Sequence, residues 1–292
     1  MLPLSECIPW MTVGLAESVA IVTLNLCTIV VFMRNRNLRK RSTYLVINLA
    51  VIDMFVGGAV VYNMFYMPGV DCNLWHSFED GTFNFIQVLI SLPYGSLTNI
   101  TSIALERVHA TFLPFRHRVL KKWVYGLIIA VVWITSGLTT IVFFTLHDLF
   151  EEIKYAFYSD LTFLSICLFI IFFSYTCIVI KVRCGAQPQH HGAASRERKL
   201  TMTLLIVTVV SVLLYLPYVV FFFVFFINKS EMSRSLRIHL NYALMFLFYA
   251  NSLVNPTLYA IRMPEYGSAF LALFRRRAQQ QRQVVELPLR NM

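Results

Sequence analysis

Seven apolar runs, each about 20 residues long or longer, constrain the fold of this chain more than any other feature. They cover approximately residues 11–33, 43–67, 80–105, 123–146, 157–181, 200–227 and 238–261. A helix needs about 20 apolar residues to cross the hydrocarbon core of a bilayer, whereas strands are much shorter. Backbone polar groups in lipid must be hydrogen-bonded within their own segment, so each run is predicted to be a helix. We therefore expect an all-α membrane protein.

The distribution of positive charge predicts how these helices are oriented. Of the 25 Lys and Arg residues, 21 lie in four segments: 34–41, 107–122, 181–199 and the residues after 261. Loops rich in Lys and Arg stay on the cytoplasmic side, so the N-terminus is predicted outside and the C-terminus inside. The first run lacks a basic start and a small-residue cleavage pattern, so we expect a retained span. The net charge of +10 fits loops that face anionic lipid, and no nucleic-acid partner is expected.

Polar side chains inside the apolar runs are costly and indicate a functional site. The second run contains the carboxylate Asp53, the third contains Ser96, and the seventh contains "NSLVNPTLY" with Asn251, Ser252 and Asn255. A carboxylate, hydroxyls and amide oxygens are suitable ligands for a small hard cation. A hydrogen-bond network around a protonated Asp53 explains the same residues equally well, and both interpretations remain open.

Two prolines lie inside the predicted spans. Pro217 in the sixth run and Pro256 in the seventh each remove a helical hydrogen bond and free a carbonyl. After Pro256, we expect Asn255 or water to take that carbonyl. Each proline can act as a swivel during a conformational change or as a static bend, and the sequence favours neither.

Taken together, these residues resemble the rhodopsin-like (class A) G-protein-coupled receptors, and the resemblance covers nearly the whole chain. The matching features are Asn25, "LAVID" with Asp53, "ERV" with Arg107, Trp133, Tyr175, Pro217 and "NPTLY" (255–259), one on each predicted span. The resemblance implies a seven-transmembrane helix bundle over residues 1–262, a short amphipathic eighth helix over 263–277 and a cytoplasmic tail over 278–292. It also implies a multi-pass protein of the plasma membrane rather than an enzyme.

The resemblance gives a role to the charged end of the third span. It implies that Arg107 pairs at rest with Glu106 and with Glu197 at the foot of the sixth span. On activation the sixth span moves outward, Arg107 meets a heterotrimeric G protein, and Tyr175 and Tyr259 move inward. The alternative is an Arg that only extends to the membrane interface. The implied partners are the G protein, arrestin, an extracellular ligand and the lipid bilayer.

The polar residues at mid-membrane are predicted to bind an allosteric sodium ion, and no other cofactor is expected. The predicted Na⁺ ligands are Asp53, Ser96, Asn251 and Asn255. A ligand shifts a conformational equilibrium only through different affinities for its two states, and we expect Na⁺ to favour the inactive one.

Several positions depart from the family pattern. Thr82 replaces the Cys of the usual disulfide, and Cys167 replaces the usual Pro of the fifth span. These losses lean towards the melanocortin, lysophospholipid and cannabinoid branch. Cys7 and Cys72 are the thiols expected outside, next to the neighbouring first and second spans. They are predicted to form a disulfide, with free thiols or pairing to another protomer as the alternatives.

The ligand is not identified by the sequence. Tyr249 stands where opsins carry the retinal Lys, and Leu89 where amine receptors carry an Asp. The candidate pocket residues are Glu17, Asn63, Leu89, Asp160, Tyr215, Tyr218, Tyr242 and Tyr249. Aromatic and Met side chains near them favour an apolar or amphipathic ligand, or a peptide.

Two other classes of membrane protein compete with a receptor. A transporter or channel should show two halves with matched interrupted helices or a ring of acids, and neither is present in the sequence. A metal enzyme needs clustered ligands, but the seven His residues are scattered over loops. Nucleotide exchange on a G protein separates a receptor from both.

Overall fold

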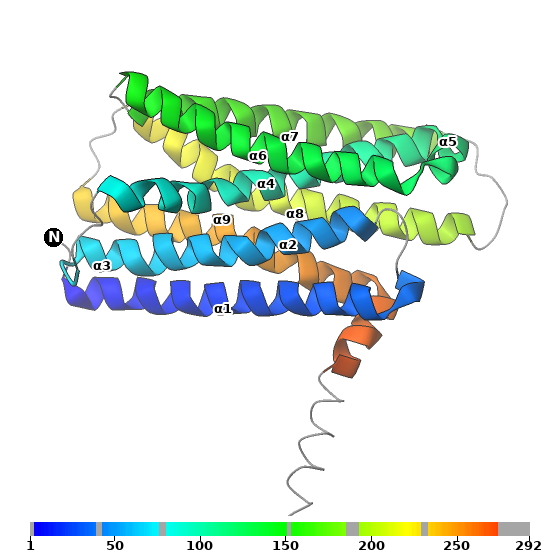
Figure 1. Cartoon of the computed structure of the whole chain (residues 1–292), viewed down its shortest axis with the longest axis horizontal. Coiled ribbons are helices and arrows are strands. Elements are labelled where there is room, and N and C mark those ends of the chain that lie inside the picture. Colours follow the sequence, from blue (N-terminus) through cyan, green and yellow to red (C-terminus); the bar gives the residue numbers. More distant parts are fainter. Residues whose placement is uncertain are drawn as a thin grey trace, which may run out of the picture.

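Seven long helical segments run side by side along one common axis in the computed structural model (Figure 1). The structure describes residues 3–38, 43–75, 80–150, 153–184, 193–228 and 233–273. The long helices are α1 (Leu4–Arg34), α2 (Thr43–Val60) with its continuation, α4 (Asp80–Phe112), α6 (Lys122–Phe150), α7 (Ile153–Cys184), α8 (Ala193–Asn228) and α9 (Arg234–Arg262). Two short elements, η1 (Arg36–Leu38) and α5 (Pro114–Val119), lie in the connections at the inner end.

The helices have the length and composition of membrane spans. In the described part of the chain, five are both long and apolar enough to cross a bilayer: Leu4–Arg34, Thr43–Asp71, Lys122–Phe143, Tyr158–Lys181 and Ser235–Ile261. The helix α8 adds the shorter apolar stretch Leu205–Phe221. The 33 residues of α4 reach about 50 Å, well beyond the roughly 30 Å of a hydrocarbon core.

The bundle is apolar outside and partly polar inside. Phe169, Phe172 and Phe173 on α7 are exposed, whereas Asp53 on α2 is completely buried. The central helix is α4, which contacts α2, α6, α7 and α8. Polar groups are therefore gathered where the helices meet, as expected for helices surrounded by lipid.

A six-residue π-helix interrupts the second span. This element, η2 (Val61–Tyr66), continues α2 and leads into α3 (Met67–Asp71). It lies before Pro68, which has no N–H with which to continue the ladder. The apolar run predicted a uniform helix here, because hydropathy does not report the local helix type. Single π turns occur frequently at functional sites.

The predicted eighth helix turns away from the bundle axis after α9 (Figure 1). Residues 264–273 are helical, and the remainder of the predicted 263–277 helix and the 278–292 tail lie outside the described residues. Tyr266 anchors this helix, because its buried ring packs against Phe32 and its hydroxyl bonds to Thr28 on α1 at 2.7 Å.

The contact between α1 and η2 requires a glycine. A Cβ on Gly14 would lie 2.8 Å from the carbonyl oxygen of Met64, a backbone atom that cannot move without shifting a helix. Ser18, one turn further in, donates to the carbonyl of Gly57 at 2.8 Å. Small residues let the two backbones approach this closely.

Gly14→Ala should therefore lower the thermal stability of the purified protein, with a cost of about 1–3 kcal/mol for the forced separation of the helices. Gly137→Ala on α6 is the matched control, because an added Cβ there meets nothing within 4 Å. Thermal unfolding followed by intrinsic fluorescence measures both. Equal melting temperatures for the two variants would contradict the close contact.

Candidate functional site

Asp53 is the hub of a polar core at the middle of the bundle. Its Oδ1 accepts hydrogen bonds from Ser96 on α4 at 2.7 Å and from Ser252 on α9 at 2.9 Å. Its Oδ2 accepts from the side-chain amide of Asn255 at 2.8 Å. One carboxylate from α2 thus joins three helices, and a hydrogen bond to a charged group contributes about 1.5–3 kcal/mol.

Pro256 has a specific structural effect on this core. It cannot bond the carbonyl of Ser252, four residues earlier, and that carbonyl accepts instead from the amide of Asn25 on α1 at 2.9 Å. Asn255 is therefore not the partner of the freed carbonyl, and the alternative partner, a water, stays a prediction. Asn255 is bound to Asp53, and Asn25 lies opposite the gap in the α9 ladder.

Asn251 binds a side chain on α8 rather than Asp53. Its amide donates to the hydroxyl of Tyr215 at 2.7 Å. Of the four predicted sodium ligands, Ser96 and Asn255 therefore contact Asp53 directly and Asn251 does not. Tyr215 connects the polar core to α8 two residues before Pro217.

The donor set of the polar core suits a monovalent hard cation. The side-chain oxygens of Asn251 and Asn255 are buried and have no hydrogen-bond partner among the described residues. In the same part of the chain, no three His, Cys, Asp or Glu side chains form a metal-binding group. One carboxylate with neutral hydroxyl and amide oxygens fits Na⁺ better than a transition metal.

Arg107 is completely buried at the inner end of α4. Its guanidinium bonds through two nitrogens to Oε2 of the neighbouring Glu106. The other oxygen of Glu106 lies 2.6 Å from Nε2 of His117 on α5 and accepts from the hydroxyl of Tyr125 on α6 at 3.2 Å. The carboxylate of Glu106 is thus bound by Arg107 on its own helix, by His117 on α5 and by Tyr125 on α6.

The remaining residues of the predicted switch are described only in part. The side chain of Glu197 lies outside the described residues, so its pairing with Arg107 stays a prediction. Tyr175 is buried and shares a hydrogen bond with Thr208 on α8 at 2.9 Å. The hydroxyl of Tyr259 is buried without a partner among the described residues, and its ring packs edge-on against Tyr266.

The candidate ligand residues form separate contacts in the outer half of the bundle. Asn63 on η2 donates to the hydroxyl of Tyr249 at 2.9 Å. Across the bundle, the hydroxyl of Tyr94 donates to Asp160 on α7 at 2.8 Å. The ring of Tyr218 packs against Phe248 with ring centroids 5.0 Å apart. The side chain of Leu89 on α4 lies outside the described residues.

Glu17, the remaining candidate on α1, is only 4% exposed. Neither of its carboxylate oxygens has a hydrogen-bond partner among the described residues.

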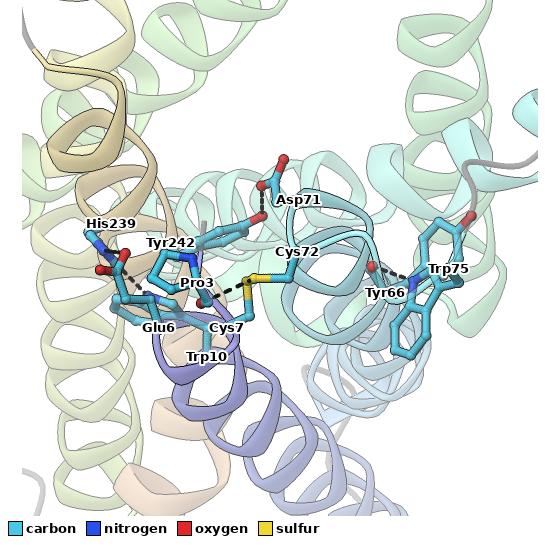
Figure 2. Close-up of a disulfide and its surroundings, with 10 residues drawn as sticks. All are labelled: Pro3, Glu6, Cys7, Trp10, Tyr66, Asp71, Cys72, Trp75, His239 and Tyr242. Carbon is cyan, nitrogen blue, oxygen red and sulfur yellow. Dashed lines mark hydrogen bonds and ion pairs between the residues drawn. A yellow bond between two sulfur atoms is a disulfide. The ribbon is translucent and has the colours of Figure 1, made fainter. Parts of the chain in front are cut away.

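A disulfide and two side-chain contacts, together called the outer tether, join the outer ends of α1, α3 and α9 (Figure 2). Cys7 and Cys72 are joined by a disulfide with Cα atoms 6.4 Å apart. Next to it, Trp10 Nε1 donates to His239 Nδ1 at 2.9 Å, and His239 Nε2 lies 2.9 Å from Glu6. Glu6, Cys7 and Trp10 belong to α1 because the helix begins at Leu4, seven residues before the first apolar run.

A second contact closes the same region. Tyr242 on α9 donates to Asp71 at the end of α3 at 2.6 Å, and its ring packs on Trp10 with centroids 5.9 Å apart (Figure 2). The candidate pocket residue Tyr242 thus joins α9 to α3 and α1 next to the disulfide.

The pattern of seven helices with this polar core and a buried Arg at the inner end of α4 defines a receptor class. The family model described as 7 transmembrane receptor (rhodopsin family) matches residues 24–259, and the chain belongs to that family. It is a multi-pass plasma-membrane receptor with a seven-transmembrane bundle, and it is not an enzyme. It binds an extracellular ligand and couples to G proteins.

Curated relatives agree with this family. The substance-K receptor of Mus musculus is 24% identical over 295 residues, which cover 91% of this chain and 75% of that receptor. The histamine H2 receptor of Canis lupus familiaris is 24% identical over 274 residues, covering 82% and 72%. The histamine H2 receptor of Homo sapiens is 25% identical over 273 residues, covering 82% and 72%. The lean towards the melanocortin, lysophospholipid and cannabinoid branch stays a prediction.

Several contributing residues had no signal in the sequence. His117 and Tyr125 bind Glu106, and His239 binds Trp10, through contacts between helices. A scattered His carries no spacing pattern, so only the folded arrangement of the helices reveals its partner. The one hint in the sequence was that His117 lies in the basic segment directly after "ERV".

Peptides from the non-reduced, alkylated protein should include one linked pair that contains Cys7 and Cys72. Cys7→Ser and Cys72→Ser should each lower the melting temperature, because either change releases α1 from α3, and the double variant should be no worse than a single one. Cys27→Ser is the control, since Cys27 is a free, half-buried thiol. Alkylation of both outer thiols in the native protein would exclude the disulfide.

Proposed function

We propose that this receptor signals through Arg107, which is held by Glu106 at rest and is released to the G protein when α8 moves outward. The observation that carries the proposal is the complete burial of Arg107 with its guanidinium bonded to Glu106. A buried charge is costly unless it is paired, so an Arg in this position needs its acid partner. Opening the inner end of the bundle exposes the guanidinium to a new partner.

The contacts around Glu106 make the resting state specific. His117 and Tyr125 hold its second oxygen, so the carboxylate keeps its place while one face remains for Arg107. Loss of the negative charge would leave a buried guanidinium without its counter-ion. The resting state would lose more than the open state, in which water and the G protein solvate Arg107.

The proposed motion requires a helix whose contacts can be exchanged. The inner half of α8 meets α7 through the hydroxyl pair of Tyr175 and Thr208. Its outer half meets α9 through Tyr215 and Asn251, just before Pro217. When α8 swings outward about Pro217, Tyr175 leaves Thr208 and turns inward, and Tyr259 reaches the space beside it.

We also propose that Na⁺ binds Asp53 and stabilises the inactive state. Ser96 and Ser252 already direct their hydroxyls at the carboxylate, and the buried oxygens of Asn251 and Asn255 lie on the same helix face. A rotation of these amides would exchange their N–H groups for oxygens around a cation. Rotation of the Asn251 amide would break its hydrogen bond to Tyr215, and through this bond the ion would act on α8.

The proposal includes the remaining partners. The exposed aromatic and aliphatic surface of α6 and α7 faces the acyl chains of the bilayer, and arrestin binds the same opened inner end as the G protein. The relatives bind, by their names, substance K and histamine. An amphipathic ligand, either an amine or a peptide, is consistent with the tyrosines and carboxylates of the outer half.

Arg107→Ala should abolish nucleotide exchange on reconstituted G proteins while surface expression stays close to that of the wild type. Arg116→Ala is the matched control, because Arg116 on α5 is exposed.

Glu106→Gln should raise basal exchange by roughly tenfold, as expected for the loss of one charge-assisted bond in the resting state. Normal signalling by Arg107→Ala at equal surface level would refute the proposed switch.

Raising the Na⁺ concentration at constant ionic strength, with choline as the replacement cation, should reduce basal nucleotide exchange by the wild type. Asp53→Asn should remove this dependence, because the carboxylate supplies the only charge of the site. The measurement is the exchange rate at several Na⁺ concentrations. The same Na⁺ dependence in both proteins, or none in the wild type, would leave the polar core a purely structural network.

A further inference from the structure

Three carboxylates lie in the interior of the apolar runs, and the chain supplies almost no positive charge to match them. They are Glu17, Asp53 and Asp160, whereas Asp80 is the first residue of the third run. The seven runs contain no Lys or Arg apart from Lys181 at the inner end of the fifth. An ionised carboxylate in an apolar interior is unfavourable unless it is paired and hydrogen-bonded. Each of the three therefore needs donors from neighbouring side chains or a cation from outside the chain.

The three carboxylates differ sharply in the partners they have. Asp53 accepts three hydrogen bonds, and Asp160, which is half-buried, accepts one from Tyr94. Glu17 is more than nine-tenths buried, and both of its oxygens lack a partner among the described residues. The greatest unmet demand for a donor is therefore at Glu17, far from the proposed sodium site.

The surroundings of Glu17 can complete a binding site. The carboxylate lies within electrostatic range of the Tyr249 hydroxyl, whose oxygen accepts from Asn63. Trp10 is on the same face of α1, seven residues and about 10 Å nearer the outside. There it packs on Tyr242, so an aromatic rim stands between Glu17 and the extracellular side.

The helix that faces Glu17 is irregular at this level. Asn63 belongs to the π-helix η2, and α1 packs directly on η2 where Gly14 meets Met64. The extra residue in a π turn changes which side chains face the bundle, and such turns are frequent at functional sites. This second observation is independent of the unpaired carboxylate and coincides with it in space.

We propose that Glu17 is the anionic anchor for a protonated primary amine on the ligand, in a subsite between α1, η2 and α9. The inference rests on the proposed receptor function and names the chemical class of its ligand. An ammonium group donates three hydrogen bonds, which the two Glu17 oxygens and the Tyr249 oxygen accept. Aromatic faces at the rim attract the same cation.

An organic cation fits this subsite better than a metal ion. Hard metal ions bind six or more oxygen ligands or retain water, but the oxygens that the described residues offer here are the two of Glu17 and the hydroxyl of Tyr249. Ile21 on α1 and Met64 on η2 belong to one buried apolar cluster with Tyr249, and both are completely buried. An arylalkyl ammonium places its charge at Glu17 and its ring among these side chains.

The test uses the full-length receptor in lipid nanodiscs with 2-phenylethylammonium as the probe and 2-phenylethanol as its neutral counterpart. The amine should raise the melting temperature of the wild type, and the alcohol should not. Glu17→Gln should weaken the amine effect about tenfold to a hundredfold, as expected for a lost charge-assisted bond. Glu17→Asp should retain part of the effect, and Glu265→Gln, which changes an exposed carboxylate beyond α9, should retain all of it.

No stabilisation of the wild type by the amine, or an equal effect in Glu17→Gln, overturns the assignment. Infrared difference spectra of the wild type give a second measurement that does not depend on a variant folding. Amine binding should change a carboxylate stretching band of the wild type, and an unchanged carboxylate region counts against the anchor.

Basal nucleotide exchange, measured on the same nanodiscs without amine, separates this inference from the proposed function. Exchange that requires Arg107, together with amine binding that ignores Glu17, removes the anchor alone. Glu17-dependent amine binding without any exchange removes the proposed switch alone.

Discussion

The apolar surroundings of the helices are the constraint on which the rest of this structure depends, because a polar side chain in a span is costly unless it finds a partner. Asp53 meets this requirement through Ser96, Ser252 and Asn255 and thereby joins α2, α4 and α9. A second set of bonds, from Trp133 to Asn48 and from Asn48 to Asn99, joins α6, α2 and α4 nearby. These bonds fix the relative positions of helices whose apolar surfaces alone would pack in several registers.

The same constraint explains why α8 is the helix suited to move. Among the described residues, α8 is bonded to α9 through Tyr215 and to α7 through Thr208, each in a separate hydrogen bond. Asp53, by contrast, would lose three hydrogen bonds at once if α2 moved away from α4 and α9. A conformational change that exchanges single bonds is less costly than one that leaves a buried carboxylate unpaired. The motion that we propose is therefore directed towards the side of the bundle where α8 lies.

Hydropathy was sufficient to predict the seven helices, since the signal for a span is local and long. The sequence also predicted that polar residues from three spans converge on Asp53. It did not predict the partner of each amide, because Asn251 and Asn255 lie on one helix face and yet bind different helices. The contact of Trp10 with His239 joins residues 229 positions apart, and no spacing rule connects them. The π turn before Pro68 was also missed, since an apolar run reads the same for either helix type.

The helix α9 connects the outer and inner sites through one continuous backbone. Tyr249 lies beside Glu17 at the outer level, Asn255 binds Asp53 at the middle, and Tyr259 lies at the inner level about 15 Å from Tyr249 along the helix axis. Pro256 breaks the ladder between them, and Asn25 holds the carbonyl that the break frees. A change at Tyr249 can therefore be carried as a rotation of the outer part of α9 about this break without unwinding the helix. Because the amides of Asn251 and Asn255 lie on the rotating part, such a rotation alters the bonds to Tyr215 and Asp53 together, and these are the bonds that join α9 to α8 and α2.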